Sequence, residues 1–110
     1  MKIETLKSSK DFKRLKNGKF HRSQSFLLQA MENVDSKIVR EGYTVTKQNG
    51  NAVIRNRIKR RLKSVAKIVF NDVKNKEWDY VMIGKKNTLL TSFEKLKSEL
   101  EIAINQIHKN

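Results

Sequence analysis

The chain has 110 residues, which suits one domain with a modest core, and we expect residues 1–110 to form a single domain. It has no cysteine, so a disulfide framework, a thiolate zinc site and a cysteine nucleophile are all excluded. Its net charge of +14 is concentrated in residues 1–67, with 18 Lys or Arg against 5 Asp or Glu, which favours a polyanionic partner such as nucleic acid.

The sequence contains no pattern typical of a membrane protein. No segment approaches the roughly 18 apolar residues of a membrane span, and the N-terminus lacks the apolar core of a secretory signal. Glu4 and Asp11 argue against a mitochondrial presequence. Binding to a membrane surface is the main alternative for so basic a chain, but the basic segment lacks Trp and Phe on its apolar side. We therefore expect a cytoplasmic protein with no membrane contact.

The first predicted element is a short helix within residues 8–18. Ser8 can cap this helix, with Asp11 three residues later, and Gly18 suits its C-terminal end. Phe12 lies on the apolar face of the helix.

Two segments with strand composition follow, at residues 20–31 and 36–47. Both are rich in β-branched and aromatic residues, with apolar side chains at alternating positions. The polar residues 32–36 between them predict a hairpin loop. Residues 47–51 predict a second turn, in which Gly50 can take a positive φ.

A helical pattern begins at residue 52 and continues to about residue 70. Its apolar residues fall within an arc of about 80° and form a stripe that should face the core: Ile54, Ile58, Leu62, Val65 and Val69. Seven basic residues share the same helix without any acidic partner: Arg55, Arg57, Lys59, Arg60, Arg61, Lys63 and Lys67. Like charges at helical spacing repel by a few tenths of a kcal/mol per pair, so the pattern favours an external polyanion over a merely solvated face.

The C-terminal third predicts one strand and one helix. Residues 78–84 form a nearly continuous apolar run, which is typical of a buried central strand. Thr91 and Glu94 have the spacing of a capping box at the start of an amphipathic helix that extends to Ile107. The charges of this helix are balanced, so we expect a structural role for it.

Residues suited to catalysis are nearly absent. His21 and His108 are the only histidines, and neither has a carboxylate or serine at a catalytic spacing. There is no carboxylate cluster for nuclease magnesium and no glycine-rich phosphate loop. We therefore predict no catalytic residue, no metal site and no tightly bound cofactor in the protein.

The order of residues in 44–63, TVTKQNGNAVIRNRIKRRLK, resembles the signature of the bacterial ribonuclease P protein subunit. In that family a strand ends at a lysine, a glycine turn follows, and Ala-Val-x-Arg-Asn-Arg-x-Lys-Arg opens a helix. The matching positions are Lys47, Gly50, Ala52, Val53, Arg55, Asn56, Arg57, Lys59 and Arg60. Residues 9–28 and 78–84 resemble the opening helix with the first strand and the last strand of the family. Lys63-Ser64 replaces the frequent Arg-Glu or Arg-Gln, and Gln29 replaces a common aromatic residue.

The resemblance implies an α+β two-layer sandwich. Its central mixed sheet has about four strands, and the elements follow in the order α-β-β-β-α-β-α. The crossover around the Arg-rich helix is left-handed, contrary to the usual preference.

The resemblance also implies the non-catalytic subunit of an endoribonuclease, ribonuclease P. The catalytic RNA of the family uses bound magnesium to remove the 5′ leader of precursor tRNA, and one protein per RNA contacts both that RNA and the leader. Phe12 and Arg14 would border a leader cleft, although Phe12 is equally suited to a core position. The full set of expected RNA-binding residues is Phe12, Arg14, Lys47, Asn51, Arg55, Asn56, Arg57, Lys59, Arg60, Arg61, Lys63 and Lys67.

Other functions remain possible on the sequence alone. A ribosomal protein or an RNA chaperone would share the basic charge and would differ in the RNA that copurifies with it. A helix-turn-helix DNA regulator fits less well, because strands rather than a partner helix precede the basic helix. A nuclease that acts without RNA would need catalytic residues of its own.

Overall fold

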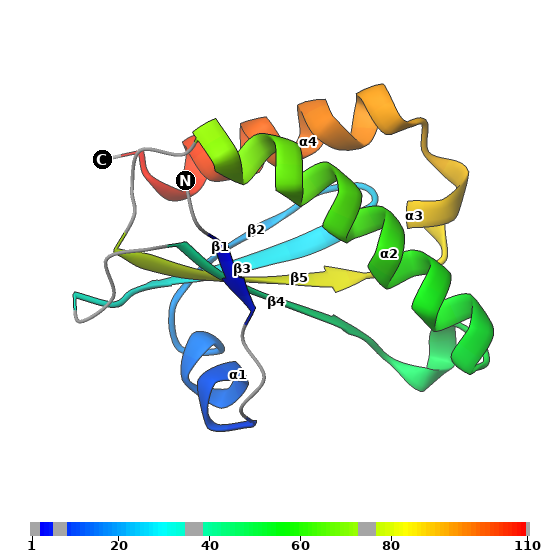
Figure 1. Ribbon diagram of the computed structural model, residues 1–110, viewed down its shortest axis with the longest axis horizontal. Coiled ribbons are helices and arrows are strands. Elements are labelled where there is room, and N and C mark those ends of the chain that lie inside the picture. Colours follow the sequence, from blue (N-terminus) through cyan, green and yellow to red (C-terminus); the bar gives the residue numbers. More distant parts are fainter. Residues whose placement is uncertain (1–2, 6–8, 35–38, 73–76, 110) are drawn as a thin grey trace.

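The computed structural model describes residues 3–5, 9–34, 39–72 and 77–109 (Figure 1). The strands are β1 (Ile3–Thr5), β2 (Lys19–Arg22), β3 (Phe26–Glu32), β4 (Val39–Val45) and β5 (Trp78–Gly84). The helices are α1 (Ser9–Leu15), α2 (Ala52–Val69), α3 (Asn87–Leu90) and α4 (Phe93–Ile107). Short 3-10 turns, η1 (Lys47–Asn49) and η2 (Phe70–Asp72), flank α2. No helix in these ranges is long and apolar enough to cross a membrane.

The strands form one mixed sheet in the order β1-β4-β5-β3-β2. β5 is the central strand, as its apolar run predicted; it pairs parallel with β4 and antiparallel with β3. The hairpin predicted at residues 32–36 is wrong, because β5 lies between β3 and β4. A polar loop indicates that the chain reverses direction, but it does not indicate that the two strands it joins pair with each other. Here β5, which is buried on both faces, lies between β3 and β4.

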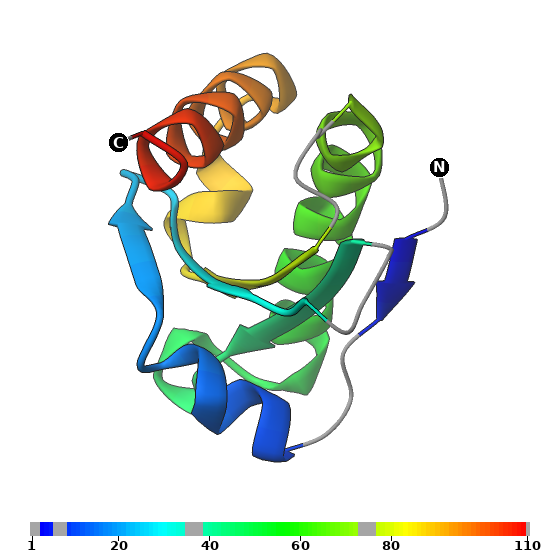
Figure 2. The ribbon, with the colours of Figure 1, turned by 90° about the vertical axis from the view of Figure 1, so that its left-hand side faces the viewer.

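The unit β4-α2-β5 is a left-handed crossover. In Figure 2 the two strands run away from the viewer, α2 lies above them, and β5 lies to the left of β4. This hand is rare in parallel crossovers. The predicted α+β fold is therefore confirmed, including the order α-β-β-β-α-β-α for α1, β2, β3, β4, α2, β5 and α4.

Two elements and one turn were not predicted. β1 adds a fifth strand, parallel to β4, and α3 precedes α4. The segment 20–31 contains parts of two strands rather than one, because residues 23–25 turn and the Ser23 amide donates to the Phe26 carbonyl at 2.9 Å. No glycine or proline marks this turn, so the alternation of apolar residues did not separate the strands.

The helices cover the two faces of the sheet unequally. α2 and α4 lie on one face and α1 lies on the other (Figures 1 and 2). The main core lies under α2 and α4, and the predicted stripe of α2 faces it, with Ile58, Leu62, Val65 and Val69 buried and Ile54 partly buried. A smaller cluster under α1 contains Leu15 and Val81, with Phe12, Met31 and Ile83 packed against it.

The N-terminus of α2 is fixed by two local features. Gly50 has φ 137°, as predicted, a conformation that side chains with a Cβ rarely adopt. The Asn51 side chain then caps the helix by accepting a hydrogen bond from the Ile54 amide at 3.0 Å.

The predicted cap of α4 is displaced by one residue. Ser92, not Thr91, caps the helix, and its hydroxyl accepts from the Lys95 amide at 3.2 Å. The Thr91 hydroxyl instead donates to the Asn87 carbonyl at 2.8 Å, because Thr91 ends α3. The predicted Ser8 cap of α1 lies outside the described residues.

The close approach of β5 to α2 requires a glycine at position 84. A Cβ there would lie 2.4 Å from Ile58 Cγ2 and 3.0 Å from Leu62 Cδ1. We expect Gly84→Ala to lower the free energy of unfolding by about 1–3 kcal/mol, the usual cost of overpacking, measured by urea denaturation. Adding Ile58→Leu to the Gly84→Ala variant removes the Cγ2 methyl that obstructs the new Cβ, so the double variant should recover part of the lost stability. If it recovered none, the contact with Ile58 would not be the cause of the loss.

Candidate nucleic-acid interface

The basic residues of α2 gather on the side of the helix that faces away from the core. Arg57, Arg60, Lys63 and Lys67 are exposed, as is Asn56, while Arg55, Lys59 and Arg61 are half-buried. Among the described residues, no Asp or Glu forms an ion pair with any of these side chains. The structure therefore presents most of the predicted α2 residues together, with a charge that the described part of the protein does not neutralise.

The turn before α2 extends this basic surface. Lys47 is exposed at the start of η1. The Asn49 side chain accepts a hydrogen bond from the Lys86 amide at 3.2 Å, which ties the turn to the segment after β5. Asn51 is also exposed, although its side-chain oxygen is already engaged in the cap.

Lys63 differs from the other basic residues of α2 because it lies close to buried groups of β4. Its Nζ is 5.7 Å from the centre of the Tyr43 ring. Burial raises the pKa of Glu41 above its ordinary value, while the charge of Lys63 acts in the opposite direction. Lys63 therefore has an electrostatic neighbour within the fold.

On the other face, α1 is anchored by a buried ion cluster centred on Asp79 of β5. Asp79 is 0% exposed and accepts hydrogen bonds from Arg40 Nε at 2.9 Å and Nη2 at 2.7 Å. Arg14 of α1 and Asn33 also donate to it. Burial raises the pKa of Asp79, but the bonds and charge of Arg40, with Asn33 and Arg14, outweigh it and hold the pKa below its ordinary value.

This cluster changes how Arg14 is interpreted. Its guanidinium already pairs with Asp79, so it positions α1, and its contact with RNA stays a prediction. Asp79 was not among the residues predicted from the sequence. A single acidic residue inside the apolar run 78–84 is the signal that could have indicated it.

Two phenylalanines lie on the side of the sheet that α1 covers. Phe12 is half-buried against the small cluster, so it has both a core contact and an accessible part. Phe20 of β2 is 65% exposed and is paired with Gln29 of β3, on the opposite face from the main core. Phe20 was not predicted as a site residue, and it lies directly beside the position where the sequence lacks an aromatic.

His108 packs against two aromatic residues of β5. His108 Nε2 shares a hydrogen bond of 2.7 Å with the Tyr80 hydroxyl, and its ring packs edge-on against Trp78 at 4.5 Å. Burial, followed by the charge of Lys19, lowers the pKa of His108. Within the described ranges, no group of three or more His, Asp or Glu side chains could hold a metal ion.

Comparison with known proteins gives one consistent family. A family model described as Ribonuclease P matches residues 1–108. The ribonuclease P protein component of Ruegeria pomeroyi is 34% identical, over 96% of this chain and 87% of that protein. That of Finegoldia magna is 40% identical, over 77% of this chain and 73% of that protein.

Solved structures show the same fold. The ribonuclease P protein of Staphylococcus aureus superposes with a TM-score of 0.79, at 25% identity and over 97% of both chains. The protein from Thermotoga maritima superposes with a TM-score of 0.76, at 23% identity and over 97% of both chains.

Proposed function

The chain belongs to the family of bacterial ribonuclease P protein components, and from this premise we propose that it binds two RNAs on opposite faces of its sheet. α2 and the turn before it hold the ribonuclease P RNA. The face beside α1 holds the single-stranded 5′ leader of precursor tRNA. Residues 1–110 act as one RNA-binding domain in this proposal.

The observation that carries the first contact is the uncompensated basic face of α2. Guanidinium groups make bidentate bonds to phosphates, and each neutralised phosphate releases counterions. The residues proposed to contact the ribonuclease P RNA are Lys47, Asn51, Arg55, Asn56, Arg57, Lys59, Arg60, Arg61, Lys63 and Lys67. Asn56, which is exposed, can add a hydrogen bond to a sugar or a base edge.

The leader contact is supported by the aromatic side chains beside α1. Flexible single strands are held by stacking on aromatic rings and by basic grooves. Phe12 offers a partly accessible ring, and Arg14, two residues later, belongs to the same anchored helix. The leader would therefore cross a surface that the buried ion cluster keeps in place.

The proposed division of labour assigns the chemistry to the RNA and its magnesium ions. We expect His21→Ala and His108→Ala to leave cleavage of precursor tRNA in place when each variant is reconstituted with ribonuclease P RNA. Cleavage should be followed with saturating protein, and circular dichroism should establish that each variant is folded. Loss of cleavage in a folded variant that still assembles with the RNA would contradict this division.

Phe12→Ala tests the leader contact. Stacking of one base on an aromatic ring is worth roughly 1–3 kcal/mol, so the variant should lose about five- to a hundredfold of the preference for precursor over mature tRNA. The measurement is a titration of the reconstituted particle with substrates of different leader length. A matched control is Trp78→Ala, which removes a partly buried aromatic ring that packs against the main core on the other face of the sheet. A folded Phe12→Ala protein with full leader discrimination would remove Phe12 from the site.

A further inference from the structure

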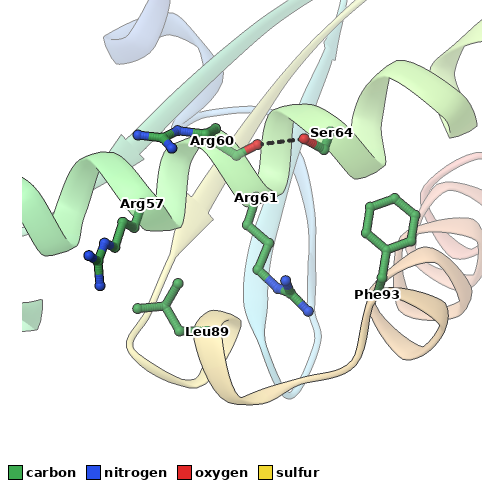
Figure 3. A pocket seen from close by; sticks show the side chains of 6 residues that line it. All are labelled: Arg57, Arg60, Arg61, Ser64, Leu89 and Phe93. Carbon is green, nitrogen blue, oxygen red and sulfur yellow. Dashed lines mark hydrogen bonds between the residues drawn. The ribbon is translucent and has the colours of Figure 1, made fainter.

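A hollow of about 300 Å³ lies between α2, α3 and the start of α4 (Figure 3). It is lined by Arg57, Arg60, Arg61 and Ser64 of α2, Leu89 of α3 and Phe93 of α4. α2 and α4, which supply five of its six lining residues, lie on the face of the sheet away from α1 (Figure 1). Its volume is at the lower end of the range of small-ligand sites, which starts at about 300 Å³.

The walls combine apolar surface with positive charge. Arg57 and Arg61 extend from α2 toward α3 and the start of α4, whereas the guanidinium of Arg60 turns to the other side of the helix (Figure 3). Leu89 and Phe93 supply the apolar surface, and none of the six lining residues is acidic. Such a wall suits a ligand that has a flat apolar part and a negative part.

A hydrogen bond to the backbone fixes the position of the Arg61 side chain in the wall of the hollow. Its Nη2 donates to the Thr91 carbonyl at 2.6 Å, which fixes the guanidinium beside the start of α4. Its Nε is buried and has no hydrogen-bond partner among the described residues. Arg61 therefore lines the hollow with a guanidinium that the protein has already positioned.

We propose that this hollow receives one unstacked nucleotide of the ribonuclease P RNA. The base lies against Phe93 and Leu89, and the adjoining phosphate lies at Arg57 and Arg61. Unstacked bases of RNA are recognised by stacking on aromatic side chains and on guanidinium planes. A free phosphate would leave the apolar wall uncovered, and an apolar peptide would desolvate the arginines without compensation.

The inference rests on the proposed function, because it takes α2 as the helix that holds the ribonuclease P RNA. The proposed leader surface lies on the opposite face of the sheet, so the nucleotide comes from the RNA at α2 and not from the leader. Leu89 and Phe93 then become RNA-binding residues outside the basic signature.

The test fills the hollow without changing charge. Ser64 is an exposed lining residue, and Ser64→Leu should occlude the space beside Phe93. We expect binding of ribonuclease P RNA to weaken by roughly five- to a hundredfold, the range for one stacked base. The slope of log affinity against log salt should fall by no more than about one unit, for the one phosphate at Arg57 and Arg61, because the phosphate contacts of the rest of α2 persist. The matched control is Ser98→Leu, an exposed serine of α4 outside the hollow, which should bind as wild type.

A second pair of variants decides the case if Ser64→Leu does not fold. Leu89 lines the hollow and is 36% exposed, whereas its neighbour Leu90 is 83% exposed and does not line it. Leu89→Ala should weaken binding by threefold or more, and Leu90→Ala should not. Wild-type affinity in folded Ser64→Leu, or equal effects at Leu89 and Leu90, would overturn the nucleotide site alone. Failure of the wild-type chain to bind ribonuclease P RNA would instead overturn the proposed function itself.

Discussion

Replacing Arg57 and Arg60 together by alanine should weaken binding of ribonuclease P RNA by on the order of a hundredfold or more. Hydrogen bonds to charged groups contribute about 1.5–3 kcal/mol each, and two guanidinium contacts to phosphate are lost. The slope of log affinity against log salt should fall by roughly two units, one for each lost phosphate contact. Titrations at several salt concentrations measure both quantities.

The fold should tolerate this double substitution. Both side chains are exposed, and neither forms a hydrogen bond or ion pair with another described residue. Alanine is also the residue most favourable to a helix. Lys95→Ala with Lys109→Ala is the matched control, because it removes the same charge from exposed positions outside α2. An unchanged slope in the arginine variant, or an equal loss in the control, would show that α2 is not the RNA-binding helix.

Asp79→Ala should lower the free energy of unfolding by about 3–5 kcal/mol, because it leaves Arg14 and Arg40 without the carboxylate between them. Urea denaturation at neutral pH measures the loss. Glu101→Ala, which removes an exposed carboxylate of α4, is the control and should change stability by less than about 0.5 kcal/mol. If Asp79→Ala matched this control, the cluster would not be what holds α1 on the sheet.

The same carboxylate makes stability depend on acid pH. The pKa of Asp79 is lower in the folded protein than its ordinary value of 3.8, so the folded state prefers the charged form. Its stabilisation is complete above that value and is lost as the pH falls below it. The gap in stability between wild type and Asp79→Asn should therefore be widest above about pH 4 and should narrow in acid. A gap that widened on acidification would contradict the direction of the shift.

The features predicted correctly are those that depend on neighbouring positions in the chain. The apolar stripe of α2 follows from helical spacing, and the positive φ of Gly50 follows from the turn that it ends. The central place of β5 follows from its sequence, because its residues are apolar on both faces of the strand apart from Asp79. The left-handed crossover was expected only through the family resemblance, since chain physics favours the other hand.

The features that were missed depend on residues far apart in the chain. Asp79 has a structural role only because the fold brings Arg14 and Arg40 to it. Phe20 is a candidate site residue only because the strand register places it beside Gln29. The cap of α4 moved to Ser92 because α3 ends at Thr91, and α3 itself is too short to leave a periodic pattern. The hollow beside Arg61 also combines three elements, and no single segment of the sequence indicates it.

The central claim is that this chain is the RNA-binding subunit of ribonuclease P through the basic face of α2. Its most direct test is to sequence the RNA that copurifies with the tagged chain from its own cells, beside the Arg57→Ala, Arg60→Ala variant at equal expression. Ribonuclease P RNA should be the dominant enriched RNA with the wild-type chain and should be lost with the variant. Enrichment of ribosomal RNA in its place, or equal recovery of ribonuclease P RNA by the variant, would contradict the account.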